Sequence, residues 1–296
     1  DTANAFRSRL INPNIFPAVT IDEIIVKALR EDIGEGDHTS LSTIPANANG
    51  KARLLVKEDG ILAGVDIARK VFFHTDDRIQ MEQFIEDGSR VKRGDVAFEV
   101  AGPSIALLTA ERTALNFMQL MSGIATQTRL MVDAIAGLPT RILDTRKTTP
   151  LLREFEKMAV RMGGGFNHRF GLYDMILIKD NHVDFAGGIS KAITACHEYM
   201  HHKGLRLAVE IEVRNLDELN QVLDHGGVNR IMLDNFSFEN LRQAVNLIGS
   251  AYETEASGGI TLQTIRQYAE CGVDFISVGA LTHHINSLDL SLKAVK

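Results

Sequence analysis

The sequence predicts an α/β protein whose second half is a parallel sheet closed into a barrel. The main observation is that short apolar strands recur from residue 141 to residue 279 with helical patterns between them, an alternation typical of right-handed crossovers. An open doubly wound sheet fits the same alternation, but no G-x-G-x-x-G follows the first strand. Nearly every strand also ends in reactive residues, which favours a barrel, although only six strands are clear.

The first hundred residues have the texture of a small α+β unit. Thr20 and Glu23 form a T-x-x-E capping box, and the apolar residues after it fall on one face, so a helix is predicted there. Short β-leaning runs broken by Gly and Asp follow over residues 51–100, and they predict a small sheet with one helix near 65–73.

A long apolar-periodic stretch then predicts one helix over residues 104–137, with a break near Ser122–Gly123. The regular alternation follows it. The predicted strands are 141–145, 175–179, 207–213, 230–234, 252–257 and 275–279, and the predicted helices are 150–162, 188–202, 216–225, 238–249 and 261–271.

Composition and charge exclude several classes of protein. Hydrophobic residues make up 45% and charged residues 24% of the 296, ordinary values for a globular protein with a sizeable core. No stretch has the length of a membrane helix, and the N-terminal DTANAFRSRL has no apolar segment of a secretory signal. A net charge of -6 argues against nucleic-acid or membrane-surface binding. Cys196 and Cys271 fit no spacing pattern, which predicts reduced thiols in a cytoplasmic protein.

Positive charge is nevertheless concentrated in residues 141–182, which contain eight Lys and Arg residues and five acidic residues. Such a cluster suits a small, multiply anionic ligand, although position alone favours a solvated charged face. The same window holds the unusual segment MGGGFNHRFG (162–171). This segment is either a flexible connection or a loop that lays Arg169 across the barrel mouth, where its planar fork would bind a carboxylate.

In chain order, the first predicted strands end in cationic residues, the middle strands in carboxylates and the last two in glycines. In a barrel all these strand ends open onto one mouth. The glycine turns after the last two strands would let backbone N–H groups approach a phosphate, with a helix predicted to begin at Thr261; plain turns are the alternative. Glu212 and Asp234 are candidates for binding Mg²⁺, for holding ribose hydroxyls or for stabilising a cationic sugar, unless they are surface acids. Glu210 points to the same face as Glu212.

The histidines do not predict a zinc site. His168 and His182 have no further ligand at metal spacing. The remaining conspicuous histidines are interpreted as surface residues, namely His201, His202, His283 and His284. Neither a G-x-S-x-G motif nor a P-loop is present.

Eight segments together resemble the quinolinate phosphoribosyltransferase family, the decarboxylating enzymes of NAD biosynthesis. They occur in the family's order over roughly residues 104–291, and in register they are very specific although each alone is weak. The segments are ERTALNFMQLMSGIAT (111–126), LDTRKTTP (143–150), GGGFNHR (163–169), LIKDNH (177–182), VEIEV (209–213), IMLDNF (231–236), EASGGIT (255–261) and FISVGALTH (275–283).

The resemblance implies an N-terminal α/β sandwich followed by an incomplete parallel α/β barrel of about six strands. The sandwich would comprise residues 1–115 joined by the C-terminal tail 285–296, and the barrel would comprise residues 116–284. The resemblance also implies a homodimer in which the neighbouring subunit completes each mouth. Arg112 looks like the arginine that reaches across this interface.

Roles for individual residues are implied as well. The two carboxylates of quinolinate would be held by Arg146, His168 and Arg169. Lys147 and Lys179 would lie between quinolinate and the pyrophosphate of the second substrate. The residues implied to bind substrate in all are Arg112, Thr145, Arg146, Lys147, His168, Arg169, Lys179, Glu212, Asp234, Ser257, Gly258, Gly259, Ser277, Val278 and Gly279.

Glu212 and Asp234 would serve the ribose hydroxyls and Mg²⁺, the one implied cofactor, while Ser257 to Gly259 and Ser277 to Gly279 would cradle the 5-phosphate. Glu212 is preferred to Glu210 from its position relative to the L-D-N segment, but an extra residue in DHGGVN leaves Glu210 as an alternative. The residues expected to be catalytic are Lys147, Lys179, Glu212 and Asp234.

The implied reaction transfers phosphoribosyl from phosphoribosyl pyrophosphate to quinolinate and yields nicotinate mononucleotide, pyrophosphate and carbon dioxide. No nucleic acid or membrane is an expected partner. The rival interpretations are a phosphoribosyltransferase for nicotinate or another planar base, a Schiff-base aldolase with Lys179 as nucleophile, and a non-catalytic sugar-phosphate binding protein.

Overall fold

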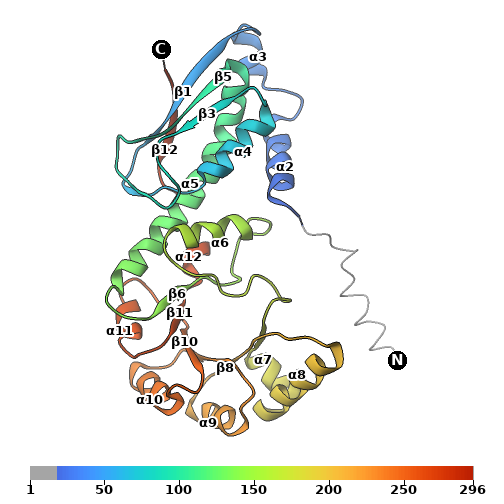
Figure 1. Cartoon of the computed structure of the whole chain (residues 1–296), viewed down its shortest axis with the longest axis vertical. Coiled ribbons are helices and arrows are strands. Elements are labelled where there is room, and N and C mark those ends of the chain that lie inside the picture. Colours follow the sequence, from blue (N-terminus) through green and yellow to red (C-terminus); the bar gives the residue numbers. More distant parts are fainter. Residues whose placement is uncertain (1–18, 296) are drawn as a thin grey trace.

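The molecule consists of an antiparallel sheet with its helices and a parallel barrel, joined by the long helix α5 (Ser104–Ala134) (Figure 1). The computed structural model describes residues 19–295, so the prediction made on DTANAFRSRL lies outside the described residues. The predicted α/β class, with a first unit of sheet and helices and an incomplete barrel of six strands, is confirmed. Among the residues described, no helix is both long and apolar enough to span a membrane.

The first sheet has the strand order β12-β1-β5-β3. Helices α4 and α5 pack against each other and beside this sheet, and α2 packs on α4. The strands are β1 (Asn49–Val56), β3 (Gln80–Gln83), β5 (Val96–Pro103) and β12 (Leu290–Val295), with a small separate pair of β2 (Gly60–Ile61) and β4 (Arg90–Val91). The helices are α2 (Ile21–Ile33), α3 (His38–Thr43) and α4 (Val65–Thr75).

Helix α2 begins at the predicted capping box. The Thr20 hydroxyl accepts the backbone N–H of Glu23 at 3.2 Å, and the Glu23 carboxylate accepts the backbone N–H of Thr20 at 2.8 Å. Two of the free N–H groups at the helix start are thereby satisfied. Ile24, Ile25 and Leu29 are buried on one face, as the sequence pattern predicts.

Helix α5 is continuous, so the predicted break near Ser122–Gly123 is wrong. Both residues are buried where other segments cross the helix. The Ser122 hydroxyl accepts the N–H of Ala63 at 2.9 Å and donates to its carbonyl at 3.1 Å. A side chain on Gly123 would clash with the carbonyl oxygen of Asn286. These small residues therefore permit close packing and do not interrupt the helix.

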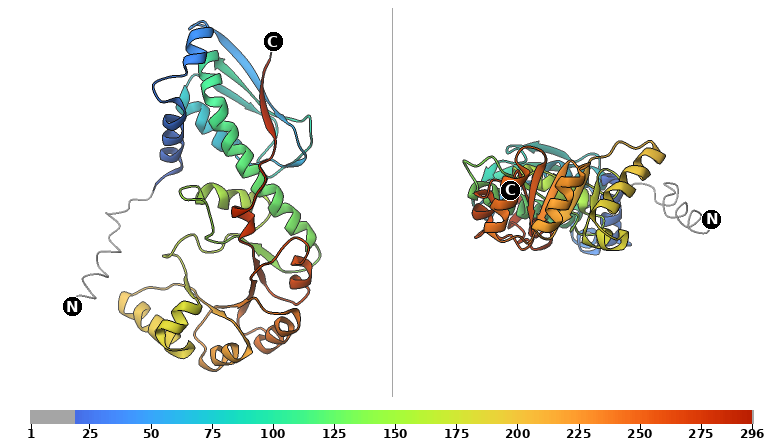
Figure 2. Two further views of the ribbon diagram at one scale, coloured as in Figure 1. Left: turned by 180° about the vertical axis from the view of Figure 1, so that it is seen from behind. Right: turned by 90° about the horizontal axis from the view of Figure 1, so that it is seen from below.

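The second sheet is parallel, with the strand order β6-β11-β10-β9-β8-β7. Within residues 19–295, β6 and β7 are its two edges, so the barrel is incomplete between them (Figure 2). Its strands are β6 (Arg141–Leu143), β7 (Ile176–Ile178), β8 (Val209–Val213), β9 (Arg230–Asp234), β10 (Glu253–Ser257) and β11 (Phe275–Ser277). Its helices are α6 (Arg153–Met162), α7 (Asp180–Ala186), α8 (Ile189–Lys203), α9 (Leu216–His225), α10 (Phe238–Ile248), α11 (Ile265–Ala269) and α12 (Ala280–His283).

Three barrel helices differ from the prediction. Helix α11 begins at Ile265, not at Thr261, because a turn in which the Thr264 hydroxyl accepts the Thr261 N–H at 3.0 Å precedes it. Helix α7 was not predicted. Val183 is its only buried residue, so its sequence carries no apolar period. Helix α12 was not predicted either, because its four residues are too few to show a period.

Alternation along the barrel strands separates side chains that face the helices from side chains that face the interior. The helix-facing residues, such as Ile211, Ile231 and Ile276, belong to the main hydrophobic core. The interior positions of the middle strands are occupied mostly by charged or polar residues: Glu210 and Glu212 on β8, Arg230, Met232 and Asp234 on β9, and Glu253, Glu255 and Ser257 on β10. The barrel interior therefore contains charged and polar groups that a purely apolar packed core would not include.

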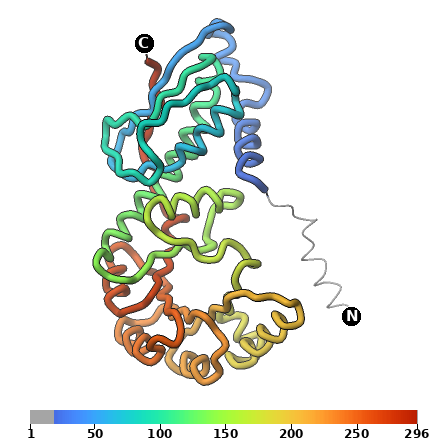
Figure 3. Tube along the Cα trace, in the orientation of Figure 1, coloured from blue at the N-terminus to red at the C-terminus, as the bar shows by residue number. Residues whose placement is uncertain are grey.

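The segment after the barrel returns to the first sheet, as the chain trace shows (Figure 3). Strand β12 pairs antiparallel with β1, in a register that places Lys51 opposite Val295 and Val56 opposite Leu290. Two stretches about 240 residues apart in sequence thus form adjacent strands.

Candidate active site

The predicted site residues gather at the carboxyl ends of the barrel strands. Because these strands are parallel and adjacent, their ends lie along one edge of the sheet (Figure 1). The residues at or just after the strand ends are Lys147 after β6, Lys179 after β7, Glu212 on β8, Asp234 on β9, Ser257 on β10 and Ser277 on β11.

Two carboxylates from neighbouring strands face each other at this edge. Asp234 is held by the Ser257 hydroxyl, which donates to Oδ1 at 2.6 Å, and by the Asn235 amide, which donates to Oδ2 at 2.6 Å. Burial, and then the negative charge of Asp234, raise the pKa of Glu212, while Lys179 lowers it. Glu212, Asp234 and Lys179 therefore share one electrostatic environment.

This pair of carboxylates fits a divalent cation. Two like charges raise each other's free energy, and a cation bound between them would remove that repulsion. Each Asp234 oxygen accepts one hydrogen bond and keeps a further lone pair for a ligand. Carboxylate oxygens, with water and substrate phosphates, are the ligands that Mg²⁺ prefers.

Two arginines lie together at the same mouth. Burial lowers the pKa of Arg169, and the charge of Arg146 lowers it further. The Nε of Arg146 is buried and donates no hydrogen bond to any described residue. Arg169 donates from Nη1 to the carbonyl of Met175 at 3.2 Å. A ligand with carboxylates would neutralise both guanidinium groups and complete their hydrogen bonding.

The glycine-rich segment is a packed loop and not a flexible connection. Phe166 forms a parallel bridge with Leu143, and its N–H donates to the carbonyl of Ile142 at 2.8 Å, so the loop extends the edge at β6. A side chain on Gly163 would clash with α5 at the carbonyl of Ala125. Glycine is therefore required here by close packing against the helix.

A buried ion pair fixes the loop beneath Arg169. The Lys157 ammonium binds the Asp144 carboxylate and donates to the carbonyl of His168 at 3.0 Å. Asp144 also accepts the N–H of His168 at 2.9 Å and the amide of Asn167. Burial raises the pKa of Asp144 and lowers that of Lys157. Lys157 therefore does not belong to the cationic surface that the sequence window indicated.

His168 lies inside the barrel, below the mouth. Its ring is almost fully buried between Glu210 and Glu255. Glu210 thus occupies a deeper position than Glu212, which distinguishes the two acids that the sequence left as alternatives. The carboxylate-binding role expected for His168 remains a prediction.

The glycine turns after β10 and β11 present free backbone donors. Within the described residues, the N–H groups of Gly258, Gly259 and Gly279 donate to no other group of the chain. Gly258 has φ +97°, and a side chain there would clash with Asn235. The N–H of Val278 differs because it donates to the carbonyl of Leu143 at 3.0 Å. Of the predicted phosphate cradle, Val278 therefore has no free N–H to offer.

A pocket of about 590 Å³ lies beside the turn at Gly279. His283 borders it, one helical turn after Gly279, and a side chain on Gly279 would meet both His283 and Lys147. His283 is exposed, as the sequence predicted. Its spacing from the glycine turn was the signal that could have indicated its place at this pocket. The lining residues are Leu120, Lys147, Thr148, Thr149, Pro150, Thr282, His283 and Ile285.

Arg112 is the predicted site residue that is not connected to the others. It is exposed in the first half of α5, and among residues 19–295 it forms no hydrogen bond or ion pair. Thr145, in contrast, accepts the N–H of Lys147 at 3.0 Å and so shapes the turn after β6.

The chain is similar to known proteins over most of its length. The models of the N-terminal and C-terminal domains of quinolinate phosphoribosyl transferase match residues 37–122 and 124–293. The chain is 44% identical to quinolinate phosphoribosyltransferase [decarboxylating] 1b of Nicotiana tabacum, over 99% of this chain and 87% of the relative. It is 42% identical to a probable nicotinate-nucleotide pyrophosphorylase [carboxylating] of Bacillus subtilis, over 88% and 89%.

A solved structure shows the same fold. NadC from Streptococcus pyogenes superposes with a TM-score of 0.88 at 39% identity, covering 94% of this chain and 99% of that one. The chain belongs to the quinolinate phosphoribosyltransferase family.

Proposed function

We propose that this chain transfers the phosphoribosyl group of phosphoribosyl pyrophosphate to quinolinate with decarboxylation, in the de novo synthesis of NAD. The products are nicotinate mononucleotide, pyrophosphate and carbon dioxide. The observation that carries this proposal is the pair Arg146 and Arg169, two neighbouring guanidinium groups at the barrel edge where the strand ends also carry Glu212 and Asp234. The relatives from Nicotiana tabacum and Bacillus subtilis are named for this reaction, in its decarboxylating and its carboxylating direction.

Each substrate has matching groups at the mouth. Arg146 and Arg169 hold the two carboxylates of quinolinate, and the turns at Gly258 and Gly279 hold the 5-phosphate through backbone N–H groups. Lys147 lies between these regions, beside Gly279. The cations bring two mutually repelling anions within bonding distance, so charge neutralisation and positioning are the main contributions to catalysis.

The bond changes follow from this placement. The bond from ribose C1 to pyrophosphate breaks, and the carboxylates of Glu212 and Asp234 stabilise the positive charge that develops on the sugar. The pyridine nitrogen then bonds to C1 and becomes cationic. This charge stabilises the carbanion left when the adjacent carboxylate departs as carbon dioxide, and the carbanion takes up a proton.

We also propose that Glu212 and Asp234 hold Mg²⁺, directly or through water. When bound, the cation would supply positive charge to the phosphate groups of phosphoribosyl pyrophosphate. This proposal is supported by the closeness of the two carboxylates: burial raises the pKa of Glu212, and the negative charge of Asp234 raises it further. Equilibrium dialysis with Mg²⁺ alone, on the native chain and on Asp234→Asn, tests the site without relying on activity.

A homodimer is part of the proposal, with Arg112 reaching the neighbouring site. Its support is that Arg112 is exposed, together with apolar side chains on the site loops, among them Leu151, Leu172 and Tyr173. Mixing Arg112→Ala chains with Arg169→Ala chains should restore activity through hybrid sites. No restoration would count against a shared site.

The proposed domains are residues 1–115 with the tail 285–296, and residues 116–284. The pairing of β12 with β1 supports the assignment of the tail. We further propose a cytoplasmic location, supported by the two free cysteines; some plant relatives are named chloroplastic or mitochondrial. Limited proteolysis tests the boundaries, and fractionation of the source cells tests the location.

The deciding experiment measures release of labelled carbon dioxide from quinolinate, with and without phosphoribosyl pyrophosphate. Release that requires both substrates is expected. Nicotinate serves as the comparison acceptor, because it carries one carboxylate fewer and would leave one of the two arginines without a partner. Turnover of nicotinate but not quinolinate would favour the related phosphoribosyltransferase instead.

A further inference from the structure

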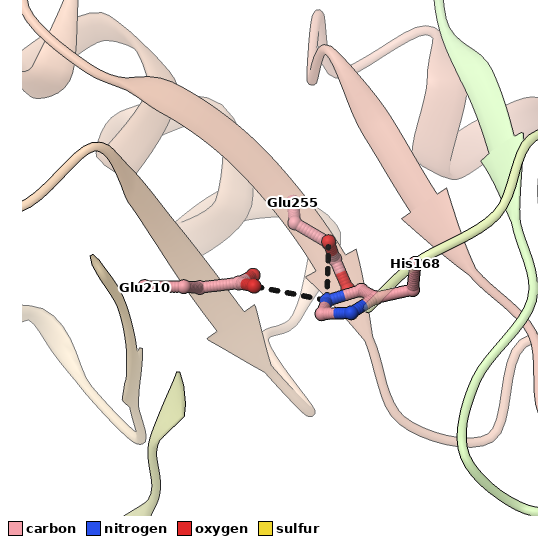
Figure 4. Close-up of side chains that lie close together, drawn as sticks. All are labelled: His168, Glu210 and Glu255. Atoms are coloured by element: carbon pink, nitrogen blue, oxygen red, sulfur yellow. Dashed lines mark ion pairs between the residues drawn. The ribbon is translucent and has the colours of Figure 1, made fainter. Parts of the chain in front are cut away.

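A cluster of three ionisable side chains lies inside the barrel, below the groups used in the reaction. The Nε2 atom of His168 lies 2.9 Å from Oε2 of Glu210 on β8 and 3.5 Å from Oε2 of Glu255 on β10 (Figure 4). Both glutamate side chains are completely buried, and His168 is 5% exposed. Both carboxyl groups lie deeper in the barrel than Glu212 and Asp234. Glu255 approaches the mouth through Ser277, and neither glutamate takes part in the proposed bond changes.

The ring of His168 is used at both nitrogens. Its Nδ1 accepts the backbone N–H of Arg169 at 2.7 Å, and a nitrogen that accepts a hydrogen bond carries no proton. The neutral ring must therefore carry its proton on Nε2, which faces the two carboxylates. Neither contact has the geometry of a hydrogen bond, so the two carboxyl groups act on this N–H through their proximity and charge.

We propose that Glu210 and Glu255 are positioning residues that hold His168 in its Nε2–H tautomer and thereby aim Arg169 at the substrate carboxylates. The connection is short, because the N–H that His168 accepts belongs to Arg169 itself. Rotation of the ring, or a proton on Nδ1, would remove that bond. The second-layer carboxylates thus act through the histidine on a group that touches the substrate. This inference rests on the proposed function.

A divalent metal at these three side chains is the main alternative, since their ligand atoms lie within 4.8 Å of one another. A metal bound at Nε2 would displace the proton from that nitrogen. The proton could not move to Nδ1, because Nδ1 accepts the Arg169 N–H. Arg230 also lies 3.2 Å from Oε2 of Glu255 and supplies a positive charge there. The cluster is therefore better suited to hold a proton on Nε2 than to bind a divalent metal ion.

The protonation of the cluster agrees with this geometry. Burial raises the pKa of Glu210 to about 7, and burial together with Glu210 raises that of Glu255 to about 8. Burial lowers the pKa of His168, which keeps the ring neutral. Near neutral pH the two carboxyl groups together retain a proton, so the cluster holds the neutral ring without an uncompensated buried charge.

Three variants test the proposal by steady-state kinetics. Glu210→Leu removes the carboxyl group that faces Nε2 of His168. It should raise the KM for quinolinate about tenfold or more while the KM for phosphoribosyl pyrophosphate changes less than about threefold. Glu210→Gln keeps an acceptor oxygen and should restore the quinolinate KM to within about threefold of the native value. Glu253→Gln is the matched control, because Glu253 also pairs with Arg230 but is half exposed. It should leave both constants unchanged.

A second measurement does not depend on activity. Long-range ¹H–¹⁵N spectra of histidine-labelled chain, with His168→Asn used for assignment, should show the Nε2–H tautomer in the native protein and its loss in Glu210→Leu. The proposal is overturned by an Nδ1–H tautomer in the native chain, by equal losses for both substrates, or by a stoichiometric metal that Glu210→Leu abolishes. If the chain does not use quinolinate, the proposed function fails while the spectra still decide the tautomer. Should Glu210→Leu not fold, the native spectrum and Glu210→Gln decide.

Discussion

The hydroxyl of Ser257 lies 2.6 Å from Oδ1 of Asp234 and donates a hydrogen bond to it across the β9–β10 pair. Asn235 donates to the other oxygen. The carboxylate plane is therefore fixed by one residue from its own strand end and one from the next strand. This fixed orientation decides where the remaining lone pairs of Asp234 point, and hence where a ribose hydroxyl or a cation would bind.

Ser257→Ala should lower kcat/KM about tenfold, because it releases one side of the Asp234 carboxylate. Ser190→Ala, on the exposed surface of α8, is the matched control and should have no effect. Steady-state kinetics with both substrates, and circular dichroism to confirm folding, provide the comparison. Equal activity of the two variants would show that the Ser257 bond does not matter for the reaction.

Arg146→Ala should weaken quinolinate binding far more than binding of phosphoribosyl pyrophosphate. The loss should reach about 10²-fold, since a buried charge-assisted pair is removed. Arg146→Lys keeps the charge but not the planar fork and should recover only part of the affinity. Isothermal titration with each substrate measures both constants; losses of equal size would contradict the role of Arg146.

Asp144→Asn should destabilise the barrel by about 3–5 kcal/mol, because it leaves the Lys157 ammonium buried without a counter-charge. Unfolding in urea, followed by circular dichroism, gives the difference. Asp66→Asn breaks an exposed pair with Arg69 and serves as the control, for which no measurable change is expected.

Gly258→Ala should abolish most activity. Its φ of +97° is unfavourable for alanine, and the added methyl group would clash with Asn235, which helps to hold Asp234. Gly249→Ala, with φ +57° and open space around it, shares the strain without the clash. An activity of Gly258→Ala as high as that of Gly249→Ala would refute the steric argument.

The barrel should lose stability as the pH rises from about 6.5 to about 8, by an amount of order 1 kcal/mol. Glu210 and Glu255 have folded pKa values of about 7 and about 8, above the unfolded value of 4.5. The folded state therefore binds more protons in this window, and the stability they provide is lost as they dissociate.

Titration of His168 makes the folded state more stable as the pH rises, because its folded pKa is lowered. This effect is confined to pH values below the unfolded pKa of 6.5. The charged groups that face the cluster are Arg230, Arg169, Lys157 and Glu253. Urea unfolding of the native chain and of the double variant Glu210→Gln with Glu255→Gln should show the decline only in the native chain.

The strands and most helices of the barrel followed from the sequence because their apolar periods are strong. The predicted break in α5 was wrong because glycine and serine there meet Asn286 and Ala63, segments far away in the chain. The same reason explains Gly163, whose contact with α5 looks in the sequence like flexibility. Local patterns cannot distinguish a glycine that bends the chain from one that admits a neighbour.

The mouth residues could be predicted because chemistry at the carboxyl ends of parallel strands is a regular feature of barrels. What could not be predicted was the depth of each residue. Alternation places Glu210 and Glu212 on one face, but only the register shows that Glu210 lies below, against His168. Likewise Lys157 counts as a cation in the sequence, while the structure buries it against Asp144.

The pairing of β12 with β1 has a consequence for how the protein is made. Strands β1, β3 and β5 leave the ribosome before the barrel exists, yet β1 stays an open edge until Leu290–Val295 has been synthesised. Through the translation of more than half the chain, the nascent sheet exposes backbone groups that another polypeptide could capture. Synthesis that stalls within the barrel would therefore release a fragment prone to association, and chaperone demand should fall once the last strand docks.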